Sequence, residues 1–466
     1  MNESVLSFKN KYFGDKNFYK MTLTIAIPII IQNLLTNLVS MADNIMVGQL
    51  GTNQMSGVAI INQLFFVFNL LVFGGMSGAG LFSAQYFGQK NHNGVRDVFR
   101  MKILIGIAII AISLSVMIFL HEPLINMFLH EGSSSGNIQE TFNYAKNYLY
   151  IMVIGIAPFV ISNCYNTTLK ESGQTVVPMK AGVLAVVFDI VLNYIFIFGK
   201  LGFPAMGVVG AAIATVISRF VECGYLVIYT HRHSNDYPFI KHCYRTLKVP
   251  GSLVKKIIVT GTPLMLNEFL WAGGLTLQTQ ALSTKGLATV GGLNICNTIG
   301  NISNCIFVTM GTTIAIVVGQ LLGAGKLKEA KVTATRMAAF SLLISFGMII
   351  ILGLLGPVFP HFYNTTDEIR ELATKFIWAV AAATPFISLS KSEYFILRSG
   401  GKTIITFLFD SCFVCLVNVP VAICLTKFTA IHIVGIFFLV NMLECIKALI
   451  GFIMVKKDIW LNTIVD

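Results

Sequence analysis

Long apolar segments dominate this chain and leave few folds open to it. Polar breaks divide the sequence into twelve apolar runs, and each run reaches the length of about 20 residues that a helix needs to cross a bilayer. The runs cover roughly 20–46, 55–86, 98–120, 141–165, 177–199, 206–230, 253–283, 288–322, 333–357, 369–396, 403–426 and 430–455. Hydrophobic residues make up 55% of the 466 positions and charged residues only 12%, which is too apolar for a soluble core. We therefore predict an all-α membrane protein with twelve transmembrane helices.

The positions of the basic residues predict how the spans are oriented. Lys and Arg total 33 and Asp and Glu total 21, a formal net charge of +12. If the N-terminus is cytoplasmic, the two tails and the loops on that side hold about 24 of the 33 basic residues, in agreement with the positive-inside rule. We expect a multi-pass protein of the plasma or inner cell membrane with both termini in the cytoplasm. The N-terminal segment is then a retained tail, and the charge gives no support to a nucleic-acid partner.

An internal repeat divides the twelve spans into two halves. At an offset of 235 residues the chain matches itself without a gap over about 60 residues. The matched pairs include Pro28 with Pro263, Gly51 with Gly286, Asn62 with Asn297, Gln85 with Gln320 and Gly88 with Gly323. We predict an N-terminal lobe over 1–230, a cytoplasmic linker over 231–252 and a C-terminal lobe over 253–466. Because each half has six spans, an even number, both insert in the same orientation, and such repeats are typical of transporters with alternating access.

Three polar residues in the first half are candidates for ion coupling, because a charge at membrane depth is expensive. Asp43 lies late in the first run, and Asp189 and Asn193 lie four residues apart in the fifth run, on one helix face. Two carboxylates and an amide can load and release a proton or a sodium ion. The alternative is a structural role, with Asp43 near the outer interface and Asp189 bonded to a neighbouring helix.

Pro28 is a candidate hinge for the first span. It lies about four turns before Asp43 and removes a backbone hydrogen bond in the middle of the run, which permits a kink. Ion loading at Asp43 can bias such a kink. The alternative is a static bend that packing accommodates.

A second set of candidates lies in the C-terminal half. Glu268 and Trp271 are three residues apart in the seventh run, where a carboxylate beside an aromatic ring suits an organic cation. Lys391 and Glu393 lie in the tenth run, and one of them can pair with Glu268 instead of forming a structural ion pair. We predict a substrate or second cation site from these four residues.

Two further charged pairs have the spacing of structural ion pairs. Arg219 with Glu222, and Glu444 with Lys447, are each three residues apart in the last spans of the two halves. We expect each pair to neutralise itself near the cytoplasmic interface.

No catalytic or energy-input motif accompanies these residues. The tripeptide at 401–403 resembles the end of a phosphate-binding loop, but Ile396 stands where the first glycine would be required. We expect a protein that is not an enzyme, has no cofactor, and has no metal site beyond a possible sodium ion at Asp43, Asp189 and Asn193. Transport would then be driven by an H⁺ or Na⁺ gradient.

Several segments resemble the multidrug and toxic compound extrusion (MATE) family across essentially the whole chain. They are MADNIMVGQLG at 41–51 after Pro28, AQYFG at 84–88, VGAAIAT at 209–215, GTP at 261–263 and GQLLGA at 319–324. The resemblance implies the MATE fold, which is shared with the MOP flippases and consists of two pseudo-symmetric six-helix lobes. It also implies export of cationic or amphipathic compounds in exchange for protons or sodium ions.

The resemblance also implies particular site residues. The family's ion site in the first lobe would fall on Asp43, Asp189, Asn193, Ala211 and Thr215. This chain reverses the family's Asn-x-x-x-Asp pair to Asp189-x-x-x-Asn193. In the second lobe Glu268 takes the place of a family acid, whereas the acid of the tenth span would fall near Ile387 or Ser388 and Glu393 lies one turn later.

The leading hypothesis is a monomeric secondary active multidrug exporter that binds small cationic or amphipathic molecules within the bilayer. One alternative is a lipid-linked oligosaccharide flippase of the same superfamily. A flippase would need a basic cavity for a pyrophosphate, whereas the charges at depth are mostly acidic. A membrane enzyme or a passive channel is a third possibility, although the sequence has no nucleophile with a matching base, and the repeat favours alternating access.

Overall fold

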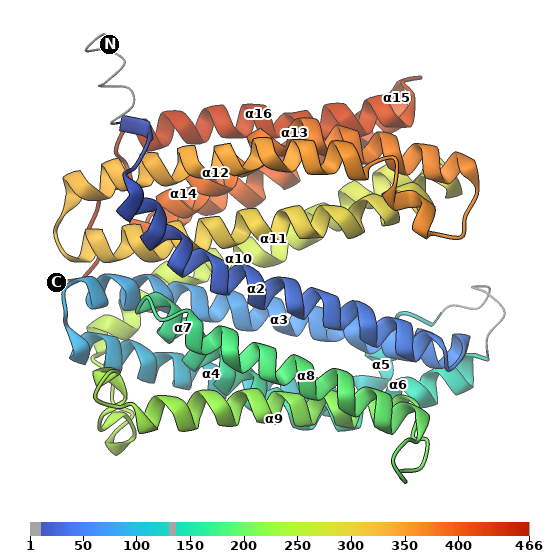
Figure 1. Ribbon diagram of the computed structural model, residues 1–466, viewed down its shortest axis with the longest axis horizontal. Helices are drawn as coiled ribbons and strands as arrows, with labels where there is room; N and C mark the ends of the chain where they lie inside the picture. The colour runs from blue at the N-terminus through green and yellow to red at the C-terminus, as the bar shows by residue number, and fades with distance from the viewer. Residues whose placement is uncertain (1–10, 130–136, 466) are drawn as a thin grey trace. The chain divides into compact units, whose positions relative to one another are not determined.

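Helices make up the protein, as the apolar runs predict. The structure is a computed structural model that describes residues 11–129 and 137–465, and no strand occurs within them (Figure 1). In the described part of the chain, 11 helical segments are long and apolar enough to cross a membrane. The remaining predicted span is α10 (Gly251–Ser283), which is equally long but carries Asn267 and Glu268 in its interior. The predicted all-α membrane fold is confirmed.

The helix bounds lie within a few residues of the predicted runs in most cases. The helices of the first half are α2 (Lys16–Gly48), α3 (Thr52–Gly88), α4 (His92–Phe119), α5 (His121–Asn126), α6 (Ile138–Met152), α7 (Ile156–Glu171), α8 (Val176–Phe198) and α9 (Val208–Arg232). The fourth span consists of α6 and α7 joined by the 3₁₀ turn η1 (Val153–Gly155). Pro158 follows this turn and cannot donate a backbone hydrogen bond to residue 154, which accounts for the break in the α-helix.

The second half begins with α10 and contains one irregular span. Its other elements are α11 (Leu287–Gly323), α12 (Leu327–Leu355), the 3₁₀ turn η4 (Phe359–Phe362), α13 (Asp367–Ser399), α14 (Thr403–Phe407), the π-helical turns η5 (Leu408–Cys412) and η6 (Val414–Asn418), α15 (Val419–Phe428) and α16 (Ile433–Lys456). The eleventh span is therefore α14, η5, η6 and α15 in succession. A π-helical turn inside a span often marks a functional position.

Two compact units make up the chain. Among the described residues, the N-unit comprises those within 31–83 and 91–257, and the C-unit comprises residues 11–30, 84–90 and 258–465. The linker predicted at 231–252 is thus part of the N-unit. The compact units are not continuous in sequence, since the start of α2 and the end of α3 belong to the C-unit. The division into two lobes at 230 and 253 stays a prediction.

Two arginines fix the segment after α9 to the N-unit. Arg100 of α4 donates from Nε to the carbonyl of Cys243 at 2.9 Å and from Nη2 to the carbonyl of His242 at 3.1 Å. Arg96, one turn earlier, donates to the carbonyls of Phe239 and Pro238. Burial raises the pKa of the Cys243 thiol to about 11, so that the thiol is protonated at neutral pH.

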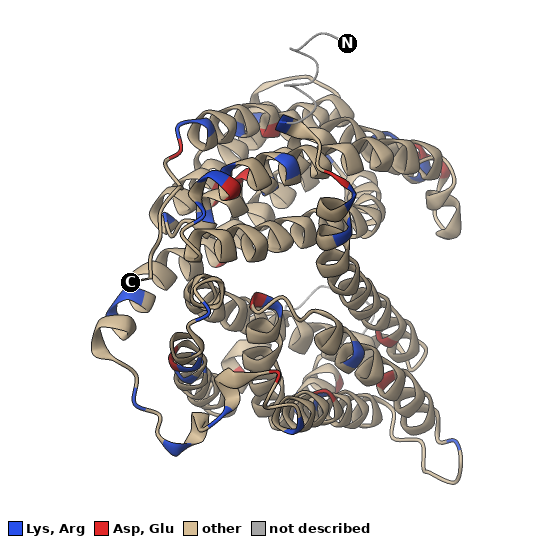
Figure 2. Ribbon diagram, turned by 60° about the vertical axis from the view of Figure 1, so that its left-hand side comes forward, with Lys and Arg blue, Asp and Glu red and all other residues tan. Residues whose placement is uncertain are grey.

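Charged residues are sparse along the helices, and many Lys and Arg lie in loops or near helix ends (Figure 2). Lys102 of α4 is an exception, because its side chain is fully buried. Its ammonium contacts Glu171 Oε2 at 2.5 Å and donates to the hydroxyls of Thr167 and Thr168. This ion pair joins α4 to α7, and its donors are satisfied, which makes its burial tolerable.

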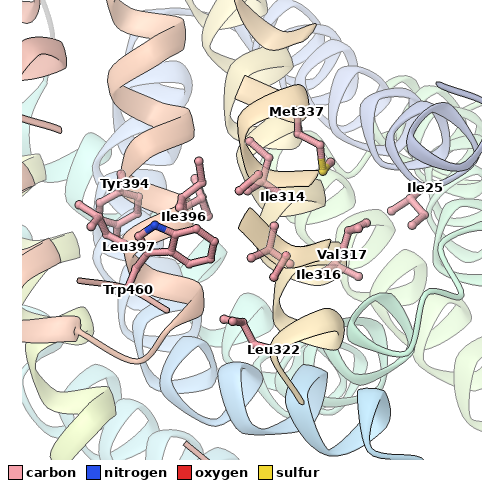
Figure 3. Close-up of a cluster of buried hydrophobic side chains, with 14 of the residues drawn as sticks. Ile25, Ile314, Ile316, Val317, Leu322, Met337, Tyr394, Ile396, Leu397 and Trp460 are labelled. Carbon is pink, nitrogen blue, oxygen red and sulfur yellow. The ribbon is translucent and has the colours of Figure 1, made fainter. Parts of the chain in front are cut away.

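The core of the C-unit forms where α11, α12 and α13 meet. Ile314, Val317 and Leu322 of α11 pack with Met337 of α12 and Leu397 of α13 (Figure 3). Residues Ile25 and Trp460, from the two ends of the chain, join the same cluster. This packing explains why the start of α2 belongs to the C-unit.

Within the C-unit, the two segments that the internal repeat matches, residues 85–88 and 320–323, contact each other. A Cβ atom at Gly88 would overlap the carbonyl oxygen of Gln320, and a Cβ atom at Gly323 would overlap that of Gln85. The ends of α3 and α11 therefore cross in close contact, and the crossing is reciprocal. Only glycine leaves room for such an approach of two backbones.

Candidate functional site

One amide joins the two carboxylates of the N-unit. The Nδ2 group of Asn193 donates to Asp43 Oδ1 at 2.7 Å and to Asp189 Oδ2 at 3.2 Å. Asp43 comes from α2, whereas Asp189 and Asn193 come from α8, where their four-residue spacing places them on one face. The structure thus brings together the three residues that the sequence singles out.

Helix α9 supplies the other side of this group. It packs along α8, and Thr215 and Ser218 are neighbours of the Asp189 carboxylate (Figure 1). Ala211, one turn before Thr215, is 4% exposed. We call Asp43, Asp189, Asn193, Ala211 and Thr215 the N-unit cluster.

The N-unit cluster contains buried oxygen atoms that no donor satisfies. Asp189 is 4% exposed and Asn193 is fully buried, and the Oδ1 atoms of both lack a hydrogen-bond partner. Buried acceptors without a donor are costly. A bound proton or a small hard cation would satisfy them, because carboxylate and amide oxygens are the ligands that such cations take.

A fixed positive charge lies near the cluster. The guanidinium of Arg219 lies between the rings of Phe65 and Phe159, with centroid distances of 5.3 and 5.1 Å. It also donates to the carbonyl of Gly155 at 3.4 Å and interacts electrostatically with Asp189. Arg219 and Glu222 interact electrostatically, as the sequence predicts. Among the described residues, however, the close contacts that hold the guanidinium are the two rings and the Gly155 carbonyl.

In the C-unit, the structure places Lys391 on Trp271. The Lys391 ammonium lies 5.0 Å from the centroid of the indole ring, which is a cation–π contact between α13 and α10. Glu268 is partly buried and interacts electrostatically with Lys391, Arg398 and Asp410. The ring face that the sequence assigns to an organic cation is thus occupied by a side chain of the protein.

Glu393 does not join that group. Two residues beyond Lys391 it faces α16, where a Cβ atom at Gly451 would overlap its Oε2 atom. The charged groups that act on it are Lys447 and Glu444. The four residues predicted as one site therefore lie in two places.

Sequence reasoning missed Asp410 and Asn267. Asp410 is 3% exposed, accepts from Asn267 Nδ2 at 3.1 Å and pairs with Lys447 Nζ at 2.6 Å. The predicted pair of Lys447 with Glu444 forms at the longer distance of 3.7 Å. An acid inside the eleventh apolar run was the signal for Asp410, whereas its pairing across helices has no signature in the sequence.

No cluster of three or more His, Cys, Asp or Glu side chains suited to a metal ion occurs in residues 11–129 and 137–465. The N-unit cluster offers two carboxylates, an amide oxygen and a hydroxyl, a donor set for a proton or a singly charged cation.

Comparison with known proteins gives consistent results. The family model MatE matches residues 28–195 and 263–424. A probable multidrug resistance protein NorM of Thermotoga maritima is 26% identical over 418 residues, which cover 89% of this chain and 87% of that protein. The probable multidrug resistance protein YoeA of Bacillus subtilis is 24% identical over 88% of this chain and 87% of its own length.

Solved structures show the same fold. An outward-facing MATE transporter of the MOP superfamily is similar with a TM-score of 0.84 at 19% identity, over 96% of both chains. The bent form of the Vibrio cholerae MATE transporter VcmN is similar with a TM-score of 0.84 at 16% identity, over 96% of this chain and 97% of that one.

Proposed function

Since the chain belongs to the MatE family of membrane transporters, we propose that it is a secondary active multidrug exporter. Relatives named as probable multidrug resistance proteins support an export function for small molecules. The substrates would be organic cations or amphipathic compounds, and the protein would work as a monomer in the cell membrane with both termini cytoplasmic.

The coupling ion would bind in the N-unit cluster. The observation that carries this proposal is the single amide of Asn193 shared by Asp43 and Asp189, beside buried oxygens without donors. When the ion leaves, the two carboxylates repel each other and only the Asn193 amide bridges them. Ion binding and release would therefore change the contact between α2 and α8, which is the link between loading and conformational change.

Ion flux in liposomes tests this function. Purified protein is reconstituted with ethidium, an organic cation, on one side, and a proton gradient and a sodium gradient are imposed separately. We expect one of the gradients to accelerate ethidium movement against its own concentration difference. Movement equal to that of protein-free liposomes under both gradients would contradict the proposal.

Pro28 would act as the hinge of α2. The boundary between the compact units falls at Ile30, so that α2 leaves the C-unit two residues after the proline. Replacing Pro28 by Ala restores a backbone hydrogen bond to Thr24 and stiffens the helix. We expect Pro28→Ala to lower the export rate while ethidium binding stays within about twofold, because binding needs no bending. An unchanged export rate would show that the bend is static.

Lys391 would compete with the substrate for the indole ring of Trp271. Removing the ammonium with Lys391→Met is expected to tighten ethidium binding by about two- to fivefold, which corresponds to about 0.5–1 kcal/mol for one cation–π contact. Ethidium fluorescence titration of the purified variant measures this. In a Trp271→Leu background the same substitution should have no effect, and an equal gain there would contradict competition at the ring.

A further inference from the structure

A second group of ionisable side chains lies between α13 and α16 of the C-unit. Ser390 and Glu393 are three residues apart on α13, and Glu444, Lys447 and Gly451 succeed one another on one face of α16. Ser390 Oγ donates to Glu444 Oε2 at 2.6 Å, and Lys447 Nζ lies 3.7 Å from Glu444 Oε1. The interface carries two carboxylates and one ammonium at membrane depth.

The π-helical turn η5 adds a third carboxylate to this group. Asp410 lies within the turn and contacts Lys447 Nζ at 2.6 Å. Its other oxygen accepts from Asn267, whose own carbonyl groups accept from Ser411. Lys447 is therefore held by Asp410 and Glu444, and both of these acids have further donors.

Glu393 has no such partner. Its side chain is 2% exposed, and neither carboxylate oxygen has a hydrogen-bond partner. Transfer of an ionised carboxylate into an apolar interior without a donor costs several kcal/mol or more. A group in this position is stable only when something neutralises it.

The packing decides what neutralises Glu393. A hard metal cation requires about six oxygen ligands around it. Here the backbone of Gly451 is pressed against Oε2, and a Cβ atom at that position would also approach Phe409 Cζ to 2.9 Å. A proton needs only one oxygen atom and no coordination shell, so it fits where a sodium ion would not.

We propose that Glu393 is a second proton-binding residue of the transport cycle, separate from the N-unit cluster. Its carboxyl group holds a proton while Asp410 and Glu444 hold Lys447. When α13 and α16 move apart, the proton passes to water, and the Lys447 ammonium, one turn from Gly451, becomes the counter-ion of the carboxylate. Glu444 and Lys447 on α16 act on Glu393 directly, and Asp410 acts on it through Lys447.

Infrared spectroscopy tests this inference without any need for transport. The sample is the full-length protein in lipid nanodiscs, and the band measured is the carbonyl stretch of a protonated carboxylic acid. We expect Glu393→Gln to remove the share of one carboxyl group from that band. The matched control is Glu371→Gln, an exposed acid on the same helix that pairs with Lys375 at 2.6 Å, and it should leave the band unchanged.

Two outcomes would overturn the proposal. One is an identical band in the wild type and in Glu393→Gln. The other is a marked loss of thermal stability in Glu393→Gln, because glutamine is a neutral isostere of the protonated acid and can replace only a side chain that is already neutral.

Because the inference rests on the proposed export function, a second readout separates the two. In liposomes, we expect Glu393→Gln to move fewer protons per exported ethidium than the wild type. If the wild type does not transport at all, the export function fails while the infrared result still decides the state of Glu393. If both proteins transport with the same proton count, the export function stands and the role of Glu393 in the cycle is refuted.

Discussion

Replacing Asp43 with Asn is expected to abolish export while the protein still reaches the membrane. The amide keeps an oxygen that can accept the 2.7 Å hydrogen bond from Asn193, so the contact between α2 and α8 persists. It cannot exchange a proton, and it lacks the charge that holds a cation. Exchange of one ion for one ethidium moves no net charge, so a tenfold ion gradient, worth about 1.4 kcal/mol, supports an ethidium concentration ratio of about ten. Cells with the variant should show no such ratio.

Ethidium accumulation in intact cells measures this effect. Membrane fractions probed for the protein show whether the variant is inserted. Glu140→Gln is the matched control, because Glu140 is an exposed acid of the N-unit that accepts from Asn53 at 2.8 Å and lies outside the cluster. Full export by Asp43→Asn would remove Asp43 from the coupling mechanism.

The largest expected loss of stability follows from breaking the buried ion pair of the C-unit. Asp410→Asn leaves the Lys447 ammonium, 2% exposed, without the negative charge that lies 2.6 Å from it. Removing one member of such a pair costs about 3–5 kcal/mol, and we expect the lower end because Glu444 stays at 3.7 Å. Unfolding by denaturing detergent in mixed micelles measures the difference.

A second substitution distinguishes an uncompensated charge from a simple loss of contacts. Adding Lys447→Met to Asp410→Asn removes the unpaired ammonium, and the double variant should recover most of the lost stability. Glu329→Gln is the control, because Glu329 and Lys326 form an exposed pair at 3.1 Å that should contribute little. A double variant no more stable than Asp410→Asn would contradict this explanation.

The fold and the N-unit cluster could be predicted from the sequence because their signals are local. An apolar run long enough to span a membrane has few alternatives, and the spacing of Asp189 and Asn193 fixes their common helix face. Asp43 is grouped with Asp189 and Asn193 because all three are polar at membrane depth, and the family resemblance implies the same group, although nothing in the spacing relates the first run to the fifth.

The C-unit could be predicted only in part, because its contacts depend on which face of α13 packs against which neighbouring helix. Lys391 and Glu393 are two residues apart and point to different helices, one to Trp271 and the other to Gly451. The π-helical turn that carries Asp410 could not be predicted either, because an apolar run gives no sign of where a helix changes to π geometry. The sequence therefore marks the acids that lie in the spans, but it does not identify what surrounds each of them.

The movement of ions in response to substrate tests the role of the N-unit cluster most directly. Ethidium is added to one side of liposomes that contain the protein and dyes for pH and sodium, with no ion gradient imposed. We predict that the wild type moves one of these ions in the opposite direction and that Asp189→Asn does not, although it still binds ethidium. Ion movement by Asp189→Asn equal to that of the wild type would contradict the coupling role of the Asp43, Asp189 and Asn193 group.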